Sequence, residues 1–347
     1  MKTNERFRHF WNSPPIITLL YRITYNPTVQ LHRPQKGRVM KTATKFVSLA
    51  MVVLLTHVAS AQIVIKPGPP KPGKQKALLS IEISQTLKVA GQELVTGQKR
   101  ISVLNRETST PAADGSIKVV ETFDSLVDET TLPGGVTLKY DSKEGAKPQG
   151  TAADFLVDVM EVMAKSETTL VFNKDGKVIS VQTKAEGLDE LAEPGKTLLQ
   201  ADLHPQVLKD RANSEIEGYN GSPVKPGDIW KKETSTDLGQ GAKFTHTATN
   251  KYMGVENKNG VRLHKVTVSY SDVEFQQDAP APGAPTIAAT DMKIVNGATT
   301  YYFDSAKQQV VHSEFDLHVQ GEIKLAIQGM EIPAELDISI AIKSKFE

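Results

Sequence analysis

Residues 299–319 read TTYYFDSAKQQVVHSEFDLHV, an apolar run, a polar turn and then a strand in which apolar and polar residues alternate. A β-rich run that ends in Phe, meets a turn built on Asp and returns with apolar residues predicts a β-hairpin. A shorter segment with a similar pattern, TTLVFNKDGKVISV, occupies residues 168–181. The two segments indicate two β units, related either by a true internal repeat or only as two ordinary hairpins.

Strand patterns surround both hairpins. Between Leu79 and Val89 most odd-numbered residues are apolar and most even-numbered ones polar, which predicts a strand with one buried and one wet face. Few of the strand-like stretches are continuously apolar and no βαβ rhythm appears, which argues against a parallel sheet. We therefore expect a mainly β protein with a few helices (α+β), built as two curved antiparallel sheets or half-barrels.

A helix is predicted over residues 152–165, inside the first unit. Thr151 and Asp154 have the spacing of a capping box, and the following turns are apolar over much more than one narrow face. Such a helix needs broad cover, most simply the concave face of the first sheet. It is interpreted either as an ordinary core helix or as a movable lid over an apolar cavity, with Met160 and Met163 as adaptable contacts.

The N-terminal region carries the pattern of a secretory signal peptide at residues 40–61. A basic start at Met40–Lys45 precedes the apolar run Phe46–Leu55, and an Ala-x-Ala site predicts cleavage between Ala61 and Gln62. The apolar run is about half the ~20 residues that span a bilayer, so no stable transmembrane segment is expected after its removal. Localisation is therefore predicted to be periplasmic or extracellular. Residues 1–39 are interpreted as a mis-called or disordered extension, or as an unusually long basic start of the signal.

Composition shifts divide the rest of the chain. After the signal come a Pro/Gly-rich linker (62–76), a first antiparallel β unit (77–185), a helical connector (186–222) and a second antiparallel β unit (223–347).

Charge and cysteine content exclude several classes of function. Residues 62–347 carry 32 basic and 39 acidic residues, a net charge of −7, which gives no basic surface for nucleic acid. The chain contains no cysteine, so no thiol acts as nucleophile or metal ligand and no disulfide holds the fold together. Core burial alone must stabilise the 286 residues that follow the signal.

Motifs for catalysis and cofactors are sparse, so we expect no catalytic residue, metal or cofactor. The stretch Gly239–Lys243 lacks the third glycine of a dinucleotide loop, and no Gly-x-Ser-x-Gly elbow is present. His312, Glu314, Asp316 and His318 share one face of a strand, but the two histidines would lie about 20 Å apart, too far for one ion. A solvated sheet face is the favoured interpretation, while paired carboxylates remain open because their separation depends on the fold.

Pro223-Val-Lys-Pro-Gly-Asp-Ile-Trp230 opens the second unit with a tight turn and the one Trp left after export. This turn, followed by long strands in an exported chain, resembles an uncharacterised domain-of-unknown-function family of exported bacterial proteins, and more loosely the curved half-barrels of lipoprotein carriers. The resemblance would cover most of residues 78–346 and implies no activity. The absence of a lipobox cysteine separates the chain from the outer-membrane lipoprotein receptors of the half-barrel group.

Three functions follow from these patterns. The preferred one is an exported, soluble, non-catalytic binding protein of the cell envelope, which holds an apolar ligand or a protein partner on curved sheets. The alternatives are an extracytoplasmic hydrolase that uses carboxylates on the sheet face and an envelope scaffold protein. Oligomeric state stays open. The predicted ligand contacts are Phe155, Met160, Met163, Trp230, Leu336, Ile338 and Ile340.

Overall fold

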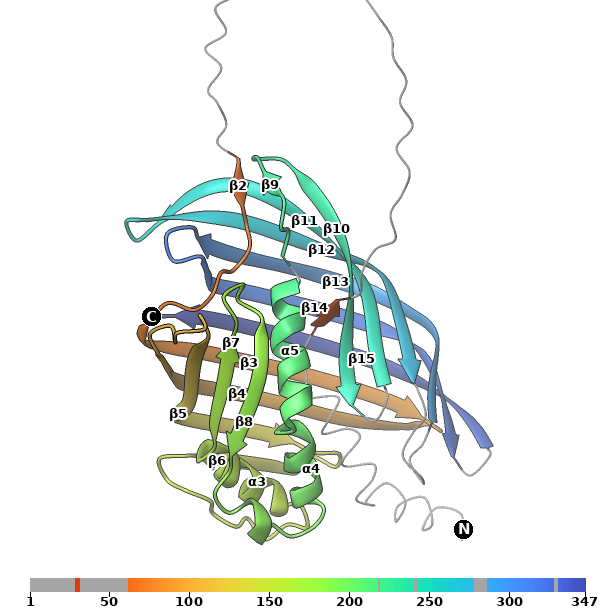
Figure 1. The fold of residues 1–347 in the computed structure, drawn as a ribbon. Coiled ribbons are helices and arrows are strands. Elements are labelled where there is room, and N and C mark those ends of the chain that lie inside the picture. The colour runs from red at the N-terminus through yellow and green to blue at the C-terminus, as the bar shows by residue number, and fades with distance from the viewer. Residues whose placement is uncertain (1–28, 32–61, 218, 240–241, 278–285, 328–329) are drawn as a thin grey trace, which may run out of the picture.

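Long antiparallel strands join side by side into a single 13-stranded sheet, accompanied by a two-stranded sheet (Figure 1). The computed structural model describes residues 29–31, 62–217, 219–239, 242–277, 286–327 and 330–347. The order along the large sheet is β1-β10-β11-β12-β13-β14-β15-β3-β4-β5-β7-β8, and β6 pairs with β5 beside this path. Its strands are β1 (Val29–Leu31), β3 (Gly73–Val89), β4 (Gln92–Thr108), β5 (Ile117–Thr131), β6 (Thr137–Asp141), β7 (Glu167–Phe172), β8 (Val178–Lys184), β10 (Ile229–Gly239), β11 (Ala242–Lys258), β12 (Val261–Gln277), β13 (Thr286–Asp304), β14 (Gln309–Ile327) and β15 (Met330–Phe346).

The predicted mainly β, antiparallel fold is confirmed, and its two halves form one open sheet. β15 pairs with β3 along most of its length, from Ala334 opposite Val89 to Phe346 opposite Ala77. The last strand of the chain therefore continues the sheet that β3 and β4 begin. This pairing satisfies the backbone groups along both strands and leaves no free edge at the junction of the two halves.

Two-residue turns set the register of two long hairpins. Ala90 and Gly91 join β3 to β4, and Asn259 and Gly260 join β11 to β12, all four with positive φ. This is the backbone of a type I′ turn, whose twist matches the twist of the strands that it connects. The two predicted hairpins are also present, as β13–β14 and as β7–β8.

Bulges help to curve the sheet. The pairing register shifts in β4–β5 near Val103, in β11–β12 near Gly254 and in β13–β14 near Asp291. An extra residue on one strand of a pair bends that strand and increases its local twist. The sheet in Figure 1 accordingly wraps around rather than lying flat.

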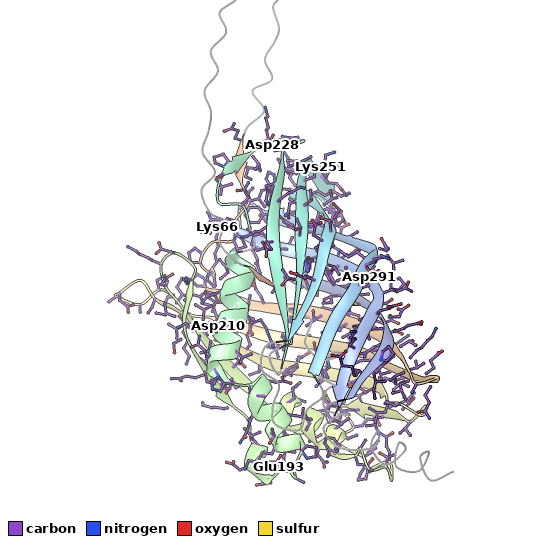
Figure 2. The ribbon with its side chains drawn as sticks, turned by 90° about the vertical axis from the view of Figure 1, so that its right-hand side faces the viewer. Lys66, Glu193, Asp210, Asp228, Lys251 and Asp291 are labelled. Carbon is purple, nitrogen blue, oxygen red and sulfur yellow. The ribbon has the colours of Figure 1, made fainter. Side chains whose placement is uncertain are left out.

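The helices gather beside the β5–β8 end of the sheet. α3 (Phe155–Ala164) lies within the helix predicted at 152–165. It is followed by the short 3₁₀ helix η1 (Leu188–Glu190), α4 (Gly195–Asp202) and α5 (Pro205–Glu217). α3 packs against β5, β6 and α4, while α5 packs against β8 and β1. Figure 2 shows Asp210 of α5 at one side of the fanned strands and Asp291 of β13 at the other.

Three apolar clusters anchor these elements. α3 and α4 bury Leu156, Met160 and Leu199 against β5 and β6. α5 packs Leu208, Ala212 and Ile216 over Ile117, Val119, Leu170, Phe172, Val178 and Val181 of β5, β7 and β8. The third cluster lies on β11–β13 and includes Ile65, Val224, Tyr252, Val266 and Phe303.

The Pro/Gly-rich segment is docked on the folded body. β2 (Ile63–Val64) pairs with β9 (Pro223–Val224), and Ile65 is fully buried. Gly68 then donates its backbone N–H to the carbonyl of Gln308 in the β13–β14 turn at 2.9 Å. The segment therefore ties the start of β3 to the second half of the sheet.

The predicted signal peptide (40–61), with cleavage residue Ala61, lies outside the described residues, and so does the preceding extension (1–39) except for β1. Gln62 is exposed at the start of the described range 62–217. Within the described ranges, none of the helices is both long enough and apolar enough to cross a membrane.

Candidate functional site

One face of the large sheet, here called the inner face, is the candidate site. Directly opposed residues of neighbouring antiparallel strands share a face, so the register defines rows of side chains across the sheet. One such row runs Leu317, Ile340, Ile83, Gln98 and Thr130 through β14, β15, β3, β4 and β5. α3 lies on this face, because the guanidinium of Arg100 in the next row reaches Met160.

The inner face of β14, β15 and β3 is an aliphatic strip. Ile338, Ile340 and Ile342 alternate along β15 and are each only half-buried. Ile81 and Phe315 flank Ile342 on the neighbouring strands and are also half-buried, whereas Leu336 and Ile83 are buried. Branched aliphatic side chains in alternation are what a strand with one apolar face requires, and here part of that surface stays in contact with water.

The strip contains three of the predicted ligand contacts. Leu336, Ile338 and Ile340 lie together on β15, while Phe155, Met160 and Met163 lie together on α3. Trp230 is on β10, where it packs with Tyr252 and Val266, and four strands separate it from β15 in the sheet. The predicted set is therefore spread over three places, and its role in binding stays a prediction.

Next to the strip the inner face becomes polar on β4 and β5. Asp128 accepts hydrogen bonds from Arg100 Nε at 2.7 Å, Gln98 Nε2 at 2.9 Å and Thr130 Oγ1 at 2.7 Å. Both charged side chains are buried, so this is an ion pair removed from water. The three donors satisfy the carboxylate, as burial of a charge requires.

The same arginine connects the sheet to α3. Its terminal nitrogens lie 3.1 Å from Met160 Sδ and 3.9 Å from Met163 Sδ. The predicted adaptable methionines are thus buried over a guanidinium, where their polarisable sulfur atoms contact the cation.

Polar contacts fix both ends of α3. Asp154 accepts from the backbone N–H of Gly150 and from Thr151, so the predicted Thr151–Asp154 pair organises the turn before the helix. Near the other end, hydrogen bonds from Lys165, Tyr140 and the Ala146 backbone lower the pKa of the Glu161 carboxyl. Burial, reinforced by the same carboxylate, raises the pKa of Tyr140.

A second, aromatic region occupies the inner face of β11–β14. The Tyr270 hydroxyl lies 2.6 Å from Thr299 Oγ1, and its ring meets His246 and Phe315 edge-on. Burial raises the pKa of Tyr270 to about 12 and lowers the pKa of His246 to about 4. Both side chains are therefore uncharged at neutral pH.

The predicted His/acid face lies on the other side of β14. His312 Nε2 is 3.0 Å from Glu314 Oε1, whereas His318 Nε2 is 3.0 Å from Asp337 Oδ1 on β15. The two histidines thus have separate acidic partners. Among the described residues, no group of three or more His, Asp and Glu side chains is arranged to hold a metal ion.

Displaced carboxyl pKa values bear on the hydrolase alternative. A general acid at neutral pH needs a raised carboxyl pKa. In the part of the chain that the structure describes, hydrogen bonds lower the carboxyl pKa of Asp114, Asp124, Asp154, Glu161 and Glu347. Shifts in this direction are typical of carboxylates that stabilise turns and surfaces.

Sequence reasoning missed the polar part of the inner face. Its signal is a break in the apolar alternation of β3, where Gln85 stands between Ile83 and Leu87. Gln85 is buried, directly opposite Thr96 of β4, which is also buried. A polar residue in phase with a buried apolar series marks a place where the face changes character.

A family of unknown function, DUF6263, has a model that matches residues 114–261. The resemblance to an uncharacterised family is confirmed. The DUF6263 match runs from the turn before β5 to the first residue of β12 and so includes all the helices described above. No curated protein matches the chain.

Solved structures resemble the chain only remotely. A structure on lipid–protein interactions in lipovitellin has a TM-score of 0.36 at 8% identity, covers 80% of this chain, and is matched over 25% of its own. A Bacteroides fragilis protein with a YmcC-like fold gives 0.20 at 10% identity, with 79% and 97% covered. A DUF1329 family protein from Desulfovibrio piger gives 0.13 at 8% identity, with 76% and 84% covered. Scores this low carry no argument about function.

Proposed function

We propose that the protein is an exported, non-catalytic binding protein of the cell envelope that holds an apolar ligand on the inner face of its sheet. The observation that carries this proposal is the half-buried aliphatic strip of Ile338, Ile340 and Ile342 with Ile81 and Phe315. The part of this apolar surface that still meets water is stabilised when a ligand covers it, by about 25 cal/mol per Å² of area covered.

The geometry of the strip fits an extended hydrocarbon chain. The three isoleucines repeat every second residue, so their side chains lie in a line about 6–7 Å apart. Leu336 continues the line at the buried end, and the buried Ile83 lies beside Ile340. A flexible acyl tail laid along this line would contact branched side chains at every step.

Export and domain arrangement belong to the same proposal. Residues 40–61 would direct secretion and be removed before Gln62, together with β1, which precedes them and pairs with β10 at one end of the sheet. The mature chain would keep the two β units (77–185 and 223–347) joined by a helical connector (186–222). N-terminal sequencing of the exported protein should begin at Gln62. A mature chain that retains residues 40–61, or that stays in the cytoplasm, would contradict the export step.

Binding is tested with N-phenylnaphthylamine, an uncharged dye whose fluorescence rises in apolar surroundings. We expect saturable binding by the purified exported protein and displacement by long-chain lipids. The double variant Ile338→Thr/Ile340→Thr keeps β-branched side chains but replaces methyl-bearing surface with hydroxyls, so the strand is preserved. The dye should bind it on the order of ten-fold more weakly.

Ser339→Thr is the matched control, because Ser339 lies between the two isoleucines on the opposite face of β15. It should bind the dye like the wild type. Equal affinities for all three proteins would place the dye elsewhere, and absence of saturable binding would overturn the proposed function. Native mass spectrometry of the protein as exported then identifies the ligand by its mass.

A further inference from the structure

Two buried polar atoms on adjacent strands of the inner face, β3 and β4, have no hydrogen-bond partner within the described chain. They are Gln85 Oε1 on β3 and Thr96 Oγ1 on β4, in residues that are 1% and 4% exposed. The two residues stand directly opposite each other, with Cβ atoms about 4.5–5.5 Å apart by the geometry of such pairs. They therefore form one polar spot rather than two separate defects.

This spot lies at the side of the aliphatic strip. Gln85 is opposite Ile338 on β15, and Ile338 is opposite Val319 on β14. The row thus reads Val319, Ile338, Gln85 and Thr96, apolar for two strands and polar for the next two. A molecule that followed the row would need an apolar part and a polar part in that order.

Burial of polar atoms without partners is rare in folded proteins, because each forfeits the hydrogen bonds it made to water. In the neighbouring row the buried Gln98 does have a partner, since it donates to Asp128, whereas Trp230 Nε1 on the distant strand β10 is, like the two oxygens here, buried without one among the described residues. We infer that the inner face takes an amphiphile with an uncharged, hydroxyl-bearing head, which hydrogen-bonds to Gln85 and Thr96 while its tail follows Ile338 and Ile340. This inference rests on the proposed function and specifies its ligand.

A hydroxyl fits these two atoms better than an anionic head does. Gln85 Oε1 only accepts, and an ionised carboxylate or phosphate diester has no proton to donate to it. A hydroxyl donates to Gln85 and accepts from the Thr96 hydroxyl at the same time. The nearby cation, Arg100, is already paired with Asp128 at 2.7 Å, so a second anion would meet a carboxylate rather than an open positive charge.

Three lipids with one acyl chain separate the possibilities, each measured by displacement of N-phenylnaphthylamine from the full exported protein. Monoolein carries hydroxyls, methyl oleate carries the same tail without a donor, and oleate is tested where it is ionised. Two neutral hydrogen bonds predict that monoolein binds about ten-fold more tightly than methyl oleate. Oleate should bind no more tightly than methyl oleate.

The double variant Gln85→Leu/Thr96→Val removes both unpaired oxygens, and the Gln85 amide nitrogen with them, with little change in volume. We expect its preference for monoolein over methyl oleate to shrink to about two-fold or less, with methyl oleate affinity retained. It should also unfold at a higher temperature than the wild type when free of lipid, because two unpaired buried groups have gone. Thr86→Val, on the opposite face beside Gln85, is the control and should keep the preference.

Each outcome decides between the two proposals. If no lipid displaces the dye, the proposed function fails and this inference fails with it. If all three lipids bind alike, or if the double variant keeps the preference, the polar spot does not recognise the head and only this inference is overturned. Tighter binding of oleate would assign an anionic head instead. Should the double variant not fold, the near-isosteric Thr96→Val alone should lose roughly half the preference on a logarithmic scale.

Discussion

The buried ion pair between Arg100 and Asp128 gives the sharpest test of how the inner face is stabilised. Asp128 accepts three hydrogen bonds of 2.7–2.9 Å, and the side chains of the pair are 8% and 5% exposed. Replacing Asp128 by Leu removes the acceptor and leaves the guanidinium charge buried. Loss of one partner of a buried pair costs about 3–5 kcal/mol, and we expect a loss of free energy of unfolding in that range.

The reverse substitution, Arg100→Met, should cost less. Asp128 keeps the hydrogen bonds from Gln98 and Thr130, so the carboxylate that remains is still partly satisfied. Methionine also preserves an apolar contact with Met160 and Met163. The combined variant Arg100→Met/Asp128→Leu should recover to within about 2 kcal/mol of the wild type, because no buried charge remains.

Urea unfolding followed by circular dichroism measures these differences, with the slope of the transition checked for constancy. The matched control is Glu82→Ala, which breaks the 3.0 Å pair with Lys99 on the opposite face of the same sheet region. Both side chains of this pair are mostly exposed, so its loss should change the free energy of unfolding very little. The reasoning is refuted if Asp128→Leu costs no more than Glu82→Ala, or if the combined variant is less stable than Asp128→Leu alone.

Three further predictions concern the edge of the sheet, α3 and the close packing of β13 on β14. Asn213→Ala should cost about 2–3 kcal/mol and increase light scattering, because this side chain pairs with the backbone N–H and C=O of edge strand β8 at 2.8 and 2.9 Å. Glu161→Gln should flatten the loss of stability below about pH 5. Lys165 first, then its other donors, lowers the folded-state pKa of Glu161 from 4.5, so its contribution is present above that value and is lost as the pH falls. Gly321→Ala should cost about 1–3 kcal/mol in the same urea assay, because its Cβ would lie 2.2 Å from the backbone oxygen of Asp291.

Each of these three predictions has its own control variant or contradicting result. Asn213→Asp retains an acceptor but no donor and should fall between the wild type and alanine. A Glu161→Gln protein that loses stability on acidification as steeply as the wild type would show that the carboxylate is not linked to folding. Gly97→Ala, where the nearest backbone atom is 3.5 Å away, should be much milder than Gly321→Ala; equal costs would point to strand propensity rather than crowding.

Local patterns predicted most of the long strands, because each of these carries its own evidence, whereas the short strands β1 and β2 lie in segments that were interpreted as an extension and a linker. Alternation from Leu79 to Val89 identifies β3, and the turn residues after Phe303 and Phe172 identify the two hairpins. The helix was predictable for the same reason, since Phe155 to Met163 is apolar without the period of a strand. Its observed start is three residues later than predicted, because Asp154 binds back to the preceding turn.

The pairing of β15 with β3 was not predictable in this way. Both strands alternate, and alternation fits any antiparallel neighbour, so nothing local distinguishes one sheet from two. The contact between Arg100 and Asp128 has the same origin, because it depends on the register of β4 on β5 across 28 residues of chain. The predicted ligand contacts on β15 lie together because they alternate along one strand, which the sequence shows directly. The distance of Trp230 from them follows from the order of strands in the sheet, which the sequence does not show.

Two sets of polar residues lie near each other on the inner face, one around Asp128 and one at Gln85 and Thr96. They differ in whether their buried polar atoms have hydrogen-bond partners, and this difference supports the proposed function. Around Asp128 three donors converge on one carboxylate, which is how a buried charge is made tolerable. At Gln85 and Thr96 no such partners are supplied, although Gln98 lies in the next row. If polarity here served only the sheet, a leucine and a valine would stabilise it more, so the presence of these two unpaired side chains supports the proposed hydrogen-bonding head of a ligand.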